Sequence, residues 1–207
     1  MIDLFTLDPV SLTAALVDVP SVSHEERPLA DMLERALRSI SGVEVLRHEN
    51  SLVARTQRGL PQRVVLAGHI DTVPIAENVP CVRGVNDQGE DTLFGCGTVD
   101  MKSGLAVYLA VFARLANDPA LAYDLTLVCY EGEEVAARFN GLGLIHDAQP
   151  DWLLGDVALL GEPSGAIIEA GCQGSIRLRV TAQGVRAPEM RSKTPKRRCK
   201  APISSTS

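Results

Sequence analysis

Aromatic residues and long hydrophobic runs are scarce in this sequence. Phe, Trp and Tyr make up 4% of the 207 residues although 45% are apolar, so the core must consist largely of Ala, Val and Leu. No stretch approaches the roughly 20 consecutive apolar residues that a membrane-spanning helix needs. The first four residues also lack the basic region and hydrophobic segment of a secretory signal. We therefore expect a cytoplasmic protein that does not insert into a membrane.

The sequence also lacks paired cysteines. The cysteines are odd in number and scattered, and none forms a Cys-x-x-Cys pair. They are Cys81, Cys96, Cys129, Cys172 and Cys199. This pattern argues against a disulfide framework and against a structural zinc site made of thiolates. A bound metal would therefore have to rest on histidine and carboxylate side chains.

Positive charge is scarce in the first 185 residues. The net charge is −6, but residues 186–207 contain seven basic residues and one acid, a local balance of +6, which leaves −12 for residues 1–185. An acidic body repels nucleic acid and is compatible with a cation site. We therefore expect no nucleic-acid partner.

The most informative stretch runs from Val64 to Asp71. Residues 64–67 are apolar on both alternating faces, which is typical of a strand buried on both sides in a parallel sheet. Ligands collect outside the carboxyl ends of such strands, where His69 lies. Asp71 projects to the same side and can fix the tautomer of His69 while the other ring nitrogen binds a metal. Taken alone, the motif is weak evidence, because many histidines at strand ends are hydrogen-bonded surface residues.

Three further stretches place acidic residues where a ligand could bind: a glycine-rich turn and the ends of two predicted strands. Asp100 lies in a glycine-rich turn before a helix, where it is either a ligand or an ordinary N-cap. Glu133 and Glu134 follow the predicted buried strand 124–130, and Glu162 follows the predicted short strand 157–160. The glutamate pair could also be a solvated cluster at a helix amino terminus. A parallel sheet would gather all these side chains at one edge.

Helical and strand periodicities alternate along the chain. They predict helices over 10–16, 29–40 and 105–115, a short helix near 142–146, and strands over 43–46, 52–54, 64–67, 124–130, 157–160 and 174–182. Asp8 and Pro9 open the first helix, and a capping-box pattern from Ser23 to Glu26 opens the second. Residues 72–98 are expected to form a long irregular loop. The remaining histidines, His24, His48 and His146, are expected at the surface. The fold class is α/β, a mostly parallel sheet with helices on both faces.

Four motifs occur in the order and spacing of a known enzyme group. They are Gly68–Pro74 (GHIDTVP), Gly95–Gly104 (GCGTVDMKSG), Glu133-Glu134 and Gly161–Ser164 (GEPS). The chain resembles the di-zinc aminoacylase and carboxypeptidase family of metallopeptidases over about residues 1–185. Within that family it is most similar to the succinyl-diaminopimelate desuccinylases of actinobacterial type. The resemblance implies a zinc-exopeptidase-like catalytic domain.

The resemblance also implies a metal site. One zinc would be held by His69, Asp100 and Glu162, and a second by Glu134 together with Asp100 as the bridging ligand. Cobalt can substitute for zinc in such sites. Two zinc ions about 3.5–4 Å apart lower the pKa of a water that they share and polarise an amide carbonyl.

The catalytic residues follow from the same resemblance. Glu133 would be the general base that takes the proton of the water and delivers it to the leaving amine. Asp71 would orient His69 without touching the metal. The resemblance further implies a cis peptide bond between Asp100 and Met101.

The resemblance ends near residue 187. We expect an incomplete catalytic domain over 1–173, the first strand of a smaller lid and dimerisation domain over 174–186, and a basic, disordered tail over 187–207. The family continues with a second histidine ligand, a histidine that stabilises the tetrahedral intermediate, and the lid residues that bind substrate carboxylates. The family homodimer surface is missing as well. We therefore expect a truncated or out-of-frame chain that binds one zinc and turns over poorly or not at all.

The implied substrate is a small N-acyl amino acid. The reaction of the most similar branch is hydrolysis of N-succinyl-LL-2,6-diaminopimelate to succinate and LL-2,6-diaminopimelate in lysine biosynthesis. Acetylornithine deacetylation or dipeptide cleavage would use the same zinc residues and remains an alternative. A non-catalytic metal-binding fragment whose basic tail binds an acidic partner is the alternative from another class.

Overall fold

The computed structural model describes residues 4–165 and 167–171. Every helix and strand described lies in one compact unit, Met1–Glu169. The helices are α1 (Pro9–Val17), α2 (Arg27–Arg38), α3 (Ser103–Leu115) and α4 (Gly141–Ala148), with single helical turns at Leu4–Thr6, Thr98–Lys102, Ala137–Phe139 and Pro150–Trp152. The strands are β1 (Val43–His48), β2 (Ser51–Thr56), β3 (Arg63–His69), β4 (Val82–Val85), β5 (Asp91–Phe94), β6 (Asp124–Tyr130) and β7 (Val157–Leu160). In this part of the chain, no helix has the length and apolar character needed to cross a membrane.

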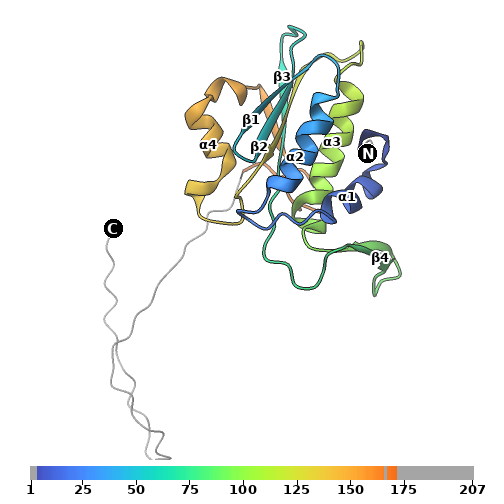
Figure 1. The fold of residues 1–207 in the computed structure, drawn as a ribbon. Coiled ribbons are helices and arrows are strands. Elements are labelled where there is room, and N and C mark those ends of the chain that lie inside the picture. Colours follow the sequence, from blue (N-terminus) through green and yellow to red (C-terminus); the bar gives the residue numbers. More distant parts are fainter. Residues whose placement is uncertain (1–3, 166, 172–207) are drawn as a thin grey trace, which may run out of the picture. The chain divides into compact units, whose positions relative to one another are not determined.

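The central sheet has five strands in the order β1-β2-β6-β3-β7. β3 pairs in parallel with both β6 and β7, whereas β2 runs antiparallel to β1 and to β6. Four of the five strands therefore run in the same direction, and β2 alone opposes them (Figure 1). This arrangement confirms the mostly parallel sheet that the sequence predicts.

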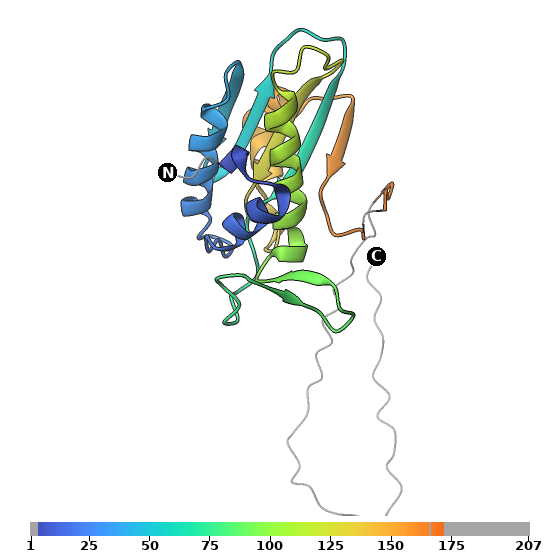
Figure 2. The same ribbon diagram turned by 90° about the vertical axis from the view of Figure 1, so that its right-hand side faces the viewer.

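Helices cover both faces of the sheet, as predicted (Figures 1 and 2). Alternate strand residues supply the two cores. Leu66 and Leu127 pack with α1, α2 and α3 on one face. Val65 and Val128 pack with Ile145 of α4 on the other face. The strands are apolar at both parities because each of their faces is buried, which explains the continuous apolar runs in β3 and β6.

The first helix begins as the sequence predicts. Asp8 is its N-cap, and the carboxylate accepts hydrogen bonds from the main-chain amides of Val10 and Ser11. Pro9 occupies the first helical position, where its missing N–H has no intrahelical partner to lose. Such a cap contributes about 1 kcal/mol.

The predicted capping box of the second helix is wrong. α2 begins at Arg27 with Glu26 as its N-cap, and no side chain caps it. The Ser23 hydroxyl instead donates to Oδ2 of Asp71 at 2.7 Å. The Ser23 hydroxyl therefore binds a carboxylate 48 residues away and does not cap the helix, although the local pattern predicts that it does.

The loop prediction for residues 72–98 is incomplete. The segment contains β4 and β5, which pair antiparallel as a separate two-stranded sheet. Asn86 shapes the turn between them, since its side-chain oxygen accepts from the amides of Gln88 and Glu90. The strands are four residues each and mostly exposed, so they give little hydrophobic periodicity to detect.

Three expectations fall outside the described residues. They are the strand over 174–182, the lid segment 174–186 and the tail 187–207. All three stay predictions.

Candidate metal centre

Three parallel strands end at the same edge of the sheet. His69 is the last residue of β3 and lies opposite Tyr130, the last residue of β6. Leu160 ends β7 and lies opposite Ala67. The segments that follow β6 and β7 therefore start beside His69, which is the convergence that the sequence predicts for a parallel sheet.

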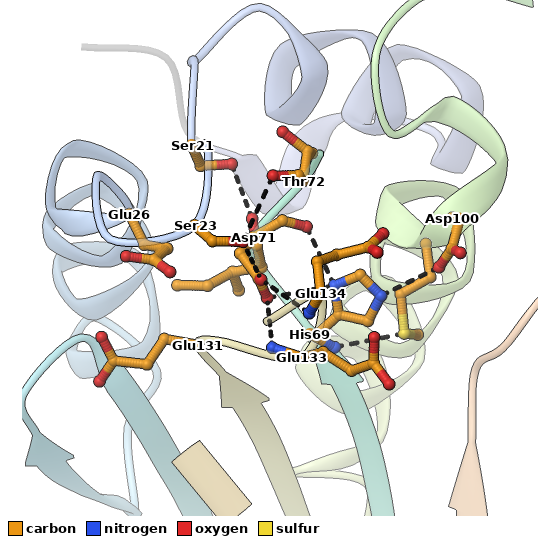
Figure 3. A network of polar contacts seen from close by, with 12 residues as sticks. Ser21, Ser23, Glu26, His69, Asp71, Thr72, Asp100, Glu131, Glu133 and Glu134 are labelled. Carbon is orange, nitrogen blue, oxygen red and sulfur yellow. Dashed lines mark hydrogen bonds and ion pairs between the residues drawn. The ribbon is translucent and has the colours of Figure 1, made fainter. Parts of the chain in front are cut away.

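His69 is fully buried and has partners at both ring nitrogens (Figure 3). Its Nε2 lies 2.9 Å from Oδ1 of Asp100. Its Nδ1 lies 3.0 Å from the main-chain oxygen of Asp71 and 3.4 Å from Oδ1 of the same residue. Asp71 thus contacts Nδ1 from behind and leaves Nε2 facing the exposed carboxylate of Asp100.

The turn that carries Asp100 is built around Met101. The Asp100–Met101 peptide bond is cis, as the resemblance implies. Met101 is fully buried, and its sulfur accepts from the main-chain amide of His69 at 3.2 Å. A Cβ on Gly68 would lie 2.6 Å from Cε of Met101. Glycine at position 68 therefore leaves room for the end of the Met101 side chain beside β3.

The structure excludes helix capping as the explanation of the acidic residues. Asp100 is not the N-cap of α3, because that position is Lys102. Glu133 and Glu134 do not open an α-helix either, since a single turn starts at Ala137 and Asn140 caps α4. Helix capping therefore does not explain why these carboxylates are where they are.

Two sets of ligand atoms converge on His69. Its imidazole, Asp100 and Glu162 have ligand atoms that all lie within 4.8 Å of one another. The same limit encloses the imidazole with Glu133 and Glu134. One imidazole nitrogen with two carboxylate oxygens is a donor set that suits zinc and related divalent ions. The residues present therefore fit a metal.

The structure groups Glu134 differently from the resemblance. Among the described residues, Glu134 clusters with His69 and Glu133, and no set of three ligands joins it to Asp100. The set for the first zinc is thus brought together as expected. The pairing of Glu134 with Asp100 stays a prediction.

The imidazole and the carboxylates of the site shift one another's pKa values. Burial alone would lower the pKa of His69, but its contacts with Asp71 and Asp100 outweigh burial and raise that pKa to about 9. Burial raises the pKa of Glu134 and of Glu162, and the nearby Asp100 carboxylate raises both further. A bound cation would relieve this crowding of acids and replace the proton on His69.

Asp71 connects the two halves of the site. Its Oδ1 accepts from the amide of Glu133 at 3.1 Å, and its Oδ2 accepts from the amide of Glu134 at 3.2 Å. Burial would raise the pKa of Asp71, but these bonds and those from His69 and Ser23 lower it. The carboxylate therefore stays ionised and holds the ends of β3 and β6 together (Figure 3).

Sequence reasoning missed Lys102. Its side chain is 1% exposed, and Nζ donates to the main-chain oxygens of Leu16 and Val19 at 3.0 Å each. The lysine thus fastens the Asp100 turn to the carboxyl end of α1. Nothing local predicts this burial, because lysines are rarely buried and its partners lie more than 80 residues away.

Comparison with known proteins gives relatives over most of this chain. A succinyl-diaminopimelate desuccinylase from Corynebacterium glutamicum is 58% identical over 188 residues, which cover 89% of this chain and 49% of the relative. A relative from Mycobacterium tuberculosis is 51% identical over 186 residues, which cover 89% of this chain and 50% of the relative. The chain spans about half the length of these relatives.

Solved structures share the fold. An M20 family metallo-carboxypeptidase from Sulfolobus solfataricus matches with a TM-score of 0.59 and 16% identity, covering 75% of this chain and 37% of that chain. A tripeptidase from Staphylococcus aureus matches with a TM-score of 0.56 and 22% identity, covering 73% of this chain and 42% of that chain. These matches confirm the predicted α/β fold.

The family itself follows from a direct sequence match. The family model described as Peptidase family M20/M25/M40 matches residues 65–193. The matched range contains all six residues singled out from the sequence: His69, Asp71, Asp100, Glu133, Glu134 and Glu162. The chain belongs to Peptidase family M20/M25/M40.

Proposed function

We propose that this chain is the metal-binding catalytic portion of a succinyl-diaminopimelate desuccinylase. The observation that carries the proposal is the convergence of His69, Asp100 and Glu162 within 4.8 Å at the carboxyl edge of the sheet. The 58% identity to the Corynebacterium glutamicum desuccinylase supports the substrate class. The reaction would hydrolyse N-succinyl-LL-2,6-diaminopimelate to succinate and LL-2,6-diaminopimelate.

His69, Asp100 and Glu162 would hold the first zinc ion, and Glu134 would contribute to a second. Zinc supplies a Lewis acid that polarises the scissile carbonyl and raises the acidity of water. The chain itself keeps the ligands in place. Asp71 holds Nδ1 of His69, which leaves Nε2 directed at the exposed Asp100 carboxylate.

Glu133 is our proposed general base. Its side chain is exposed, and one of its carboxylate oxygens lies within 4.8 Å of both the His69 and the Glu134 ligand atoms. The main-chain amide of Glu133 donates to Asp71, which fixes the backbone from which the Glu133 side chain extends. The carboxylate oxygens remain available to accept a proton. Glu133 would accept the proton of the attacking water on Oε and return it to the departing nitrogen.

Hydrolysis assays with Glu133→Gln test this proposal. The glutamine keeps the shape of the side chain and the hydrogen bond from the main-chain amide to Asp71 but cannot accept the proton. The kcat should therefore fall 100-fold or more at unchanged zinc content. The matched control is Glu90→Gln, an exposed glutamate of the β4–β5 hairpin. Turnover of Glu133→Gln at the rate of the unmodified chain would contradict the assignment.

A substrate panel tests the specificity. N-succinyl-LL-2,6-diaminopimelate should be hydrolysed faster than N-acetylornithine or a dipeptide. Preference for either competitor would assign another amidohydrolase activity of the family. Zinc binding without hydrolysis of any compound would assign a non-catalytic metal-binding role. A cytoplasmic location and a homodimeric assembly stay predictions.

A further inference from the structure

The Asp71 carboxylate has one short hydrogen bond and three long contacts. The Ser23 hydroxyl donates to Oδ2 at 2.7 Å. The amides of Glu133 and Glu134 donate at 3.1 and 3.2 Å, and Nδ1 of His69 lies 3.4 Å from Oδ1. Ser23 is therefore the closest partner of the carboxylate that backs the candidate metal site (Figure 3).

Main-chain pairing brings Ser23 to this position. Residues 21–23 lie alongside 70–72, where the amide of Thr72 donates to Ser21 at 2.9 Å and the amide of Ser23 donates to Thr72 at 3.1 Å. The Ser21 hydroxyl adds a bond of 2.7 Å to the main-chain oxygen of Ile70. The connection between α1 and α2 thus pairs with the segment that directly follows β3, independently of the Ser23 hydroxyl.

The turn after Ser23 contains unfavourable features that helix capping does not require. His24 has a φ of 77°, which is rare for a residue other than glycine. Glu26 is 1% exposed; its Oε1 accepts from the amide of His24 at 2.9 Å, while its Oε2 has no hydrogen-bond partner. Burial raises the pKa of Glu26, and nearby Glu131 and Asp71 raise it further. Strained or poorly satisfied segments of this kind are retained where they position a site.

We propose that Ser23 is a positioning residue of the metal centre. Its hydroxyl fixes Oδ2 of Asp71, and the fixed carboxylate holds the Glu133–Glu134 turn through two main-chain amides. The same carboxylate lies 3.4 Å from Nδ1 of His69, beside the main-chain oxygen of Asp71 that contacts Nδ1 at 3.0 Å. The hydroxyl touches no candidate ligand, so it acts only through Asp71. This role rests on the proposed metal-dependent function.

Loss of the hydroxyl would loosen the carboxylate without detaching the segment. In Ser23→Ala, Oδ2 loses its shortest bond and keeps the bond of 3.2 Å from Glu134, while Oδ1 keeps the bond of 3.1 Å from Glu133, so the carboxylate is held more loosely beside Nδ1 of His69. The main-chain bonds to Thr72 remain. Removing a group that contacts a metal ligand directly, as Asp71 contacts His69, typically weakens metal binding by 10–100-fold, and Ser23 acts one contact further out, so the lower end of that range is expected.

The test measures the zinc affinity of the 207-residue chain by competition with a chromophoric chelator. Ser23→Ala should bind zinc at least about tenfold more weakly, and Ser23→Thr, which keeps the hydroxyl, should recover most of that loss. The matched control is Ser11→Ala, because the Ser11 hydroxyl donates to an aspartate, Asp8, at a similar 2.6 Å in the exposed cap of α1. Ser11→Ala should leave zinc affinity unchanged.

A spectroscopic measurement separates positioning from general stability. In the chelator-treated chain, the ¹⁵N shifts of the His69 imidazole should change in Ser23→Ala and not in Ser11→Ala, even where both variants have the same unfolding midpoint. Zinc affinity and ¹⁵N shifts equal to those of the unmodified chain in Ser23→Ala would overturn the proposal. Loss of affinity that Ser23→Thr fails to recover would overturn it too.

The proposed function can fail separately. If the unmodified chain binds zinc and hydrolyses N-acetylornithine or a dipeptide in preference to N-succinyl-LL-2,6-diaminopimelate, the desuccinylase proposal is wrong, while the Ser23 result still decides the positioning role. If the chain hydrolyses the substrate and Ser23→Ala binds zinc normally, only the positioning role is wrong.

Discussion

Replacing Gly104 with alanine would place a Cβ 2.1 Å from the main-chain oxygen of Gly161. Real Cβ contacts are essentially never shorter than 3.0 Å, so one backbone must retreat by about 1 Å. Gly161 cannot retreat freely, because its amide donates to the oxygen of Ala67 at 3.0 Å. The contact joins the first turn of α3, which follows Asp100, to the residue before Glu162.

The magnitude follows from two opposed terms. Overpacking costs about 1–3 kcal/mol, and the clash with fixed backbone favours the upper end. Alanine recovers up to about 1 kcal/mol of helix propensity relative to glycine. We therefore expect Gly104→Ala to be less stable by about 2 kcal/mol. Displacement of Glu162 by about 1 Å should also weaken zinc binding tenfold or more.

Urea unfolding of the chelator-treated chain and zinc competition measure the two effects. Gly143→Ala in α4 is the matched control, because a Cβ there meets nothing within 4 Å. It should stabilise the chain by up to about 1 kcal/mol and leave zinc affinity unchanged. If Gly104→Ala is as stable as the unmodified chain and binds zinc equally well, the close approach of Gly104 to the main-chain oxygen of Gly161 does not position Glu162, and the argument is refuted.

Three further predictions concern titratable groups. Burial lowers the pKa of Lys102 from 10.5 to about 8, so the folded chain binds fewer protons than the unfolded chain between these two pH values. Over that range the free energy of unfolding, measured with urea, should rise by about 3 kcal/mol relative to that of Lys102→Met. Parallel pH profiles for the two proteins would contradict this. Zinc binding at pH 7 should release about one proton, because contacts with Asp71 and Asp100 raise the pKa of His69 to about 9 and a ligating imidazole is neutral. Calorimetry in buffers of different ionisation enthalpy counts the released protons. Zero release would refute the assignment of His69 as a ligand. Asp124→Asn should lower the free energy of unfolding by about 1–3 kcal/mol at pH 7. Hydrogen bonds from one hydroxyl and two amides outweigh burial and lower the pKa of Asp124, so the difference should shrink as the pH falls below 3.8. A difference that does not change with pH would argue against the ionised carboxylate.

The sequence predicts the ligand positions because they follow strong local signals. Residues 64–67 and 127–130 are apolar at both parities, which is typical of a strand buried on both faces. A parallel register then brings the ends of these strands to one edge. His69 and the Glu133–Glu134 pair could be placed beside each other from that argument alone.

Roles that depend on tertiary contacts were not predictable. Ser23 matches a local capping pattern, yet its partner Asp71 lies 48 residues away. Lys102 looks like a surface residue of a glycine-rich motif until the carboxyl end of α1 is folded against it. The β4–β5 hairpin buries little, so it leaves no apolar periodicity in the sequence. In each case the missing information is the identity of a partner distant in sequence.

The most direct test of the metal centre is the zinc content of the purified chain after dialysis, alongside Glu162→Ala. Elemental analysis should find about one tightly held zinc per chain that disappears in Glu162→Ala, because His69, Asp100 and Glu162 would supply its ligands. The control Glu44→Ala, an exposed glutamate of β1, should retain the metal. A chain that retains no zinc, or a Glu162→Ala variant that keeps it, would contradict the account.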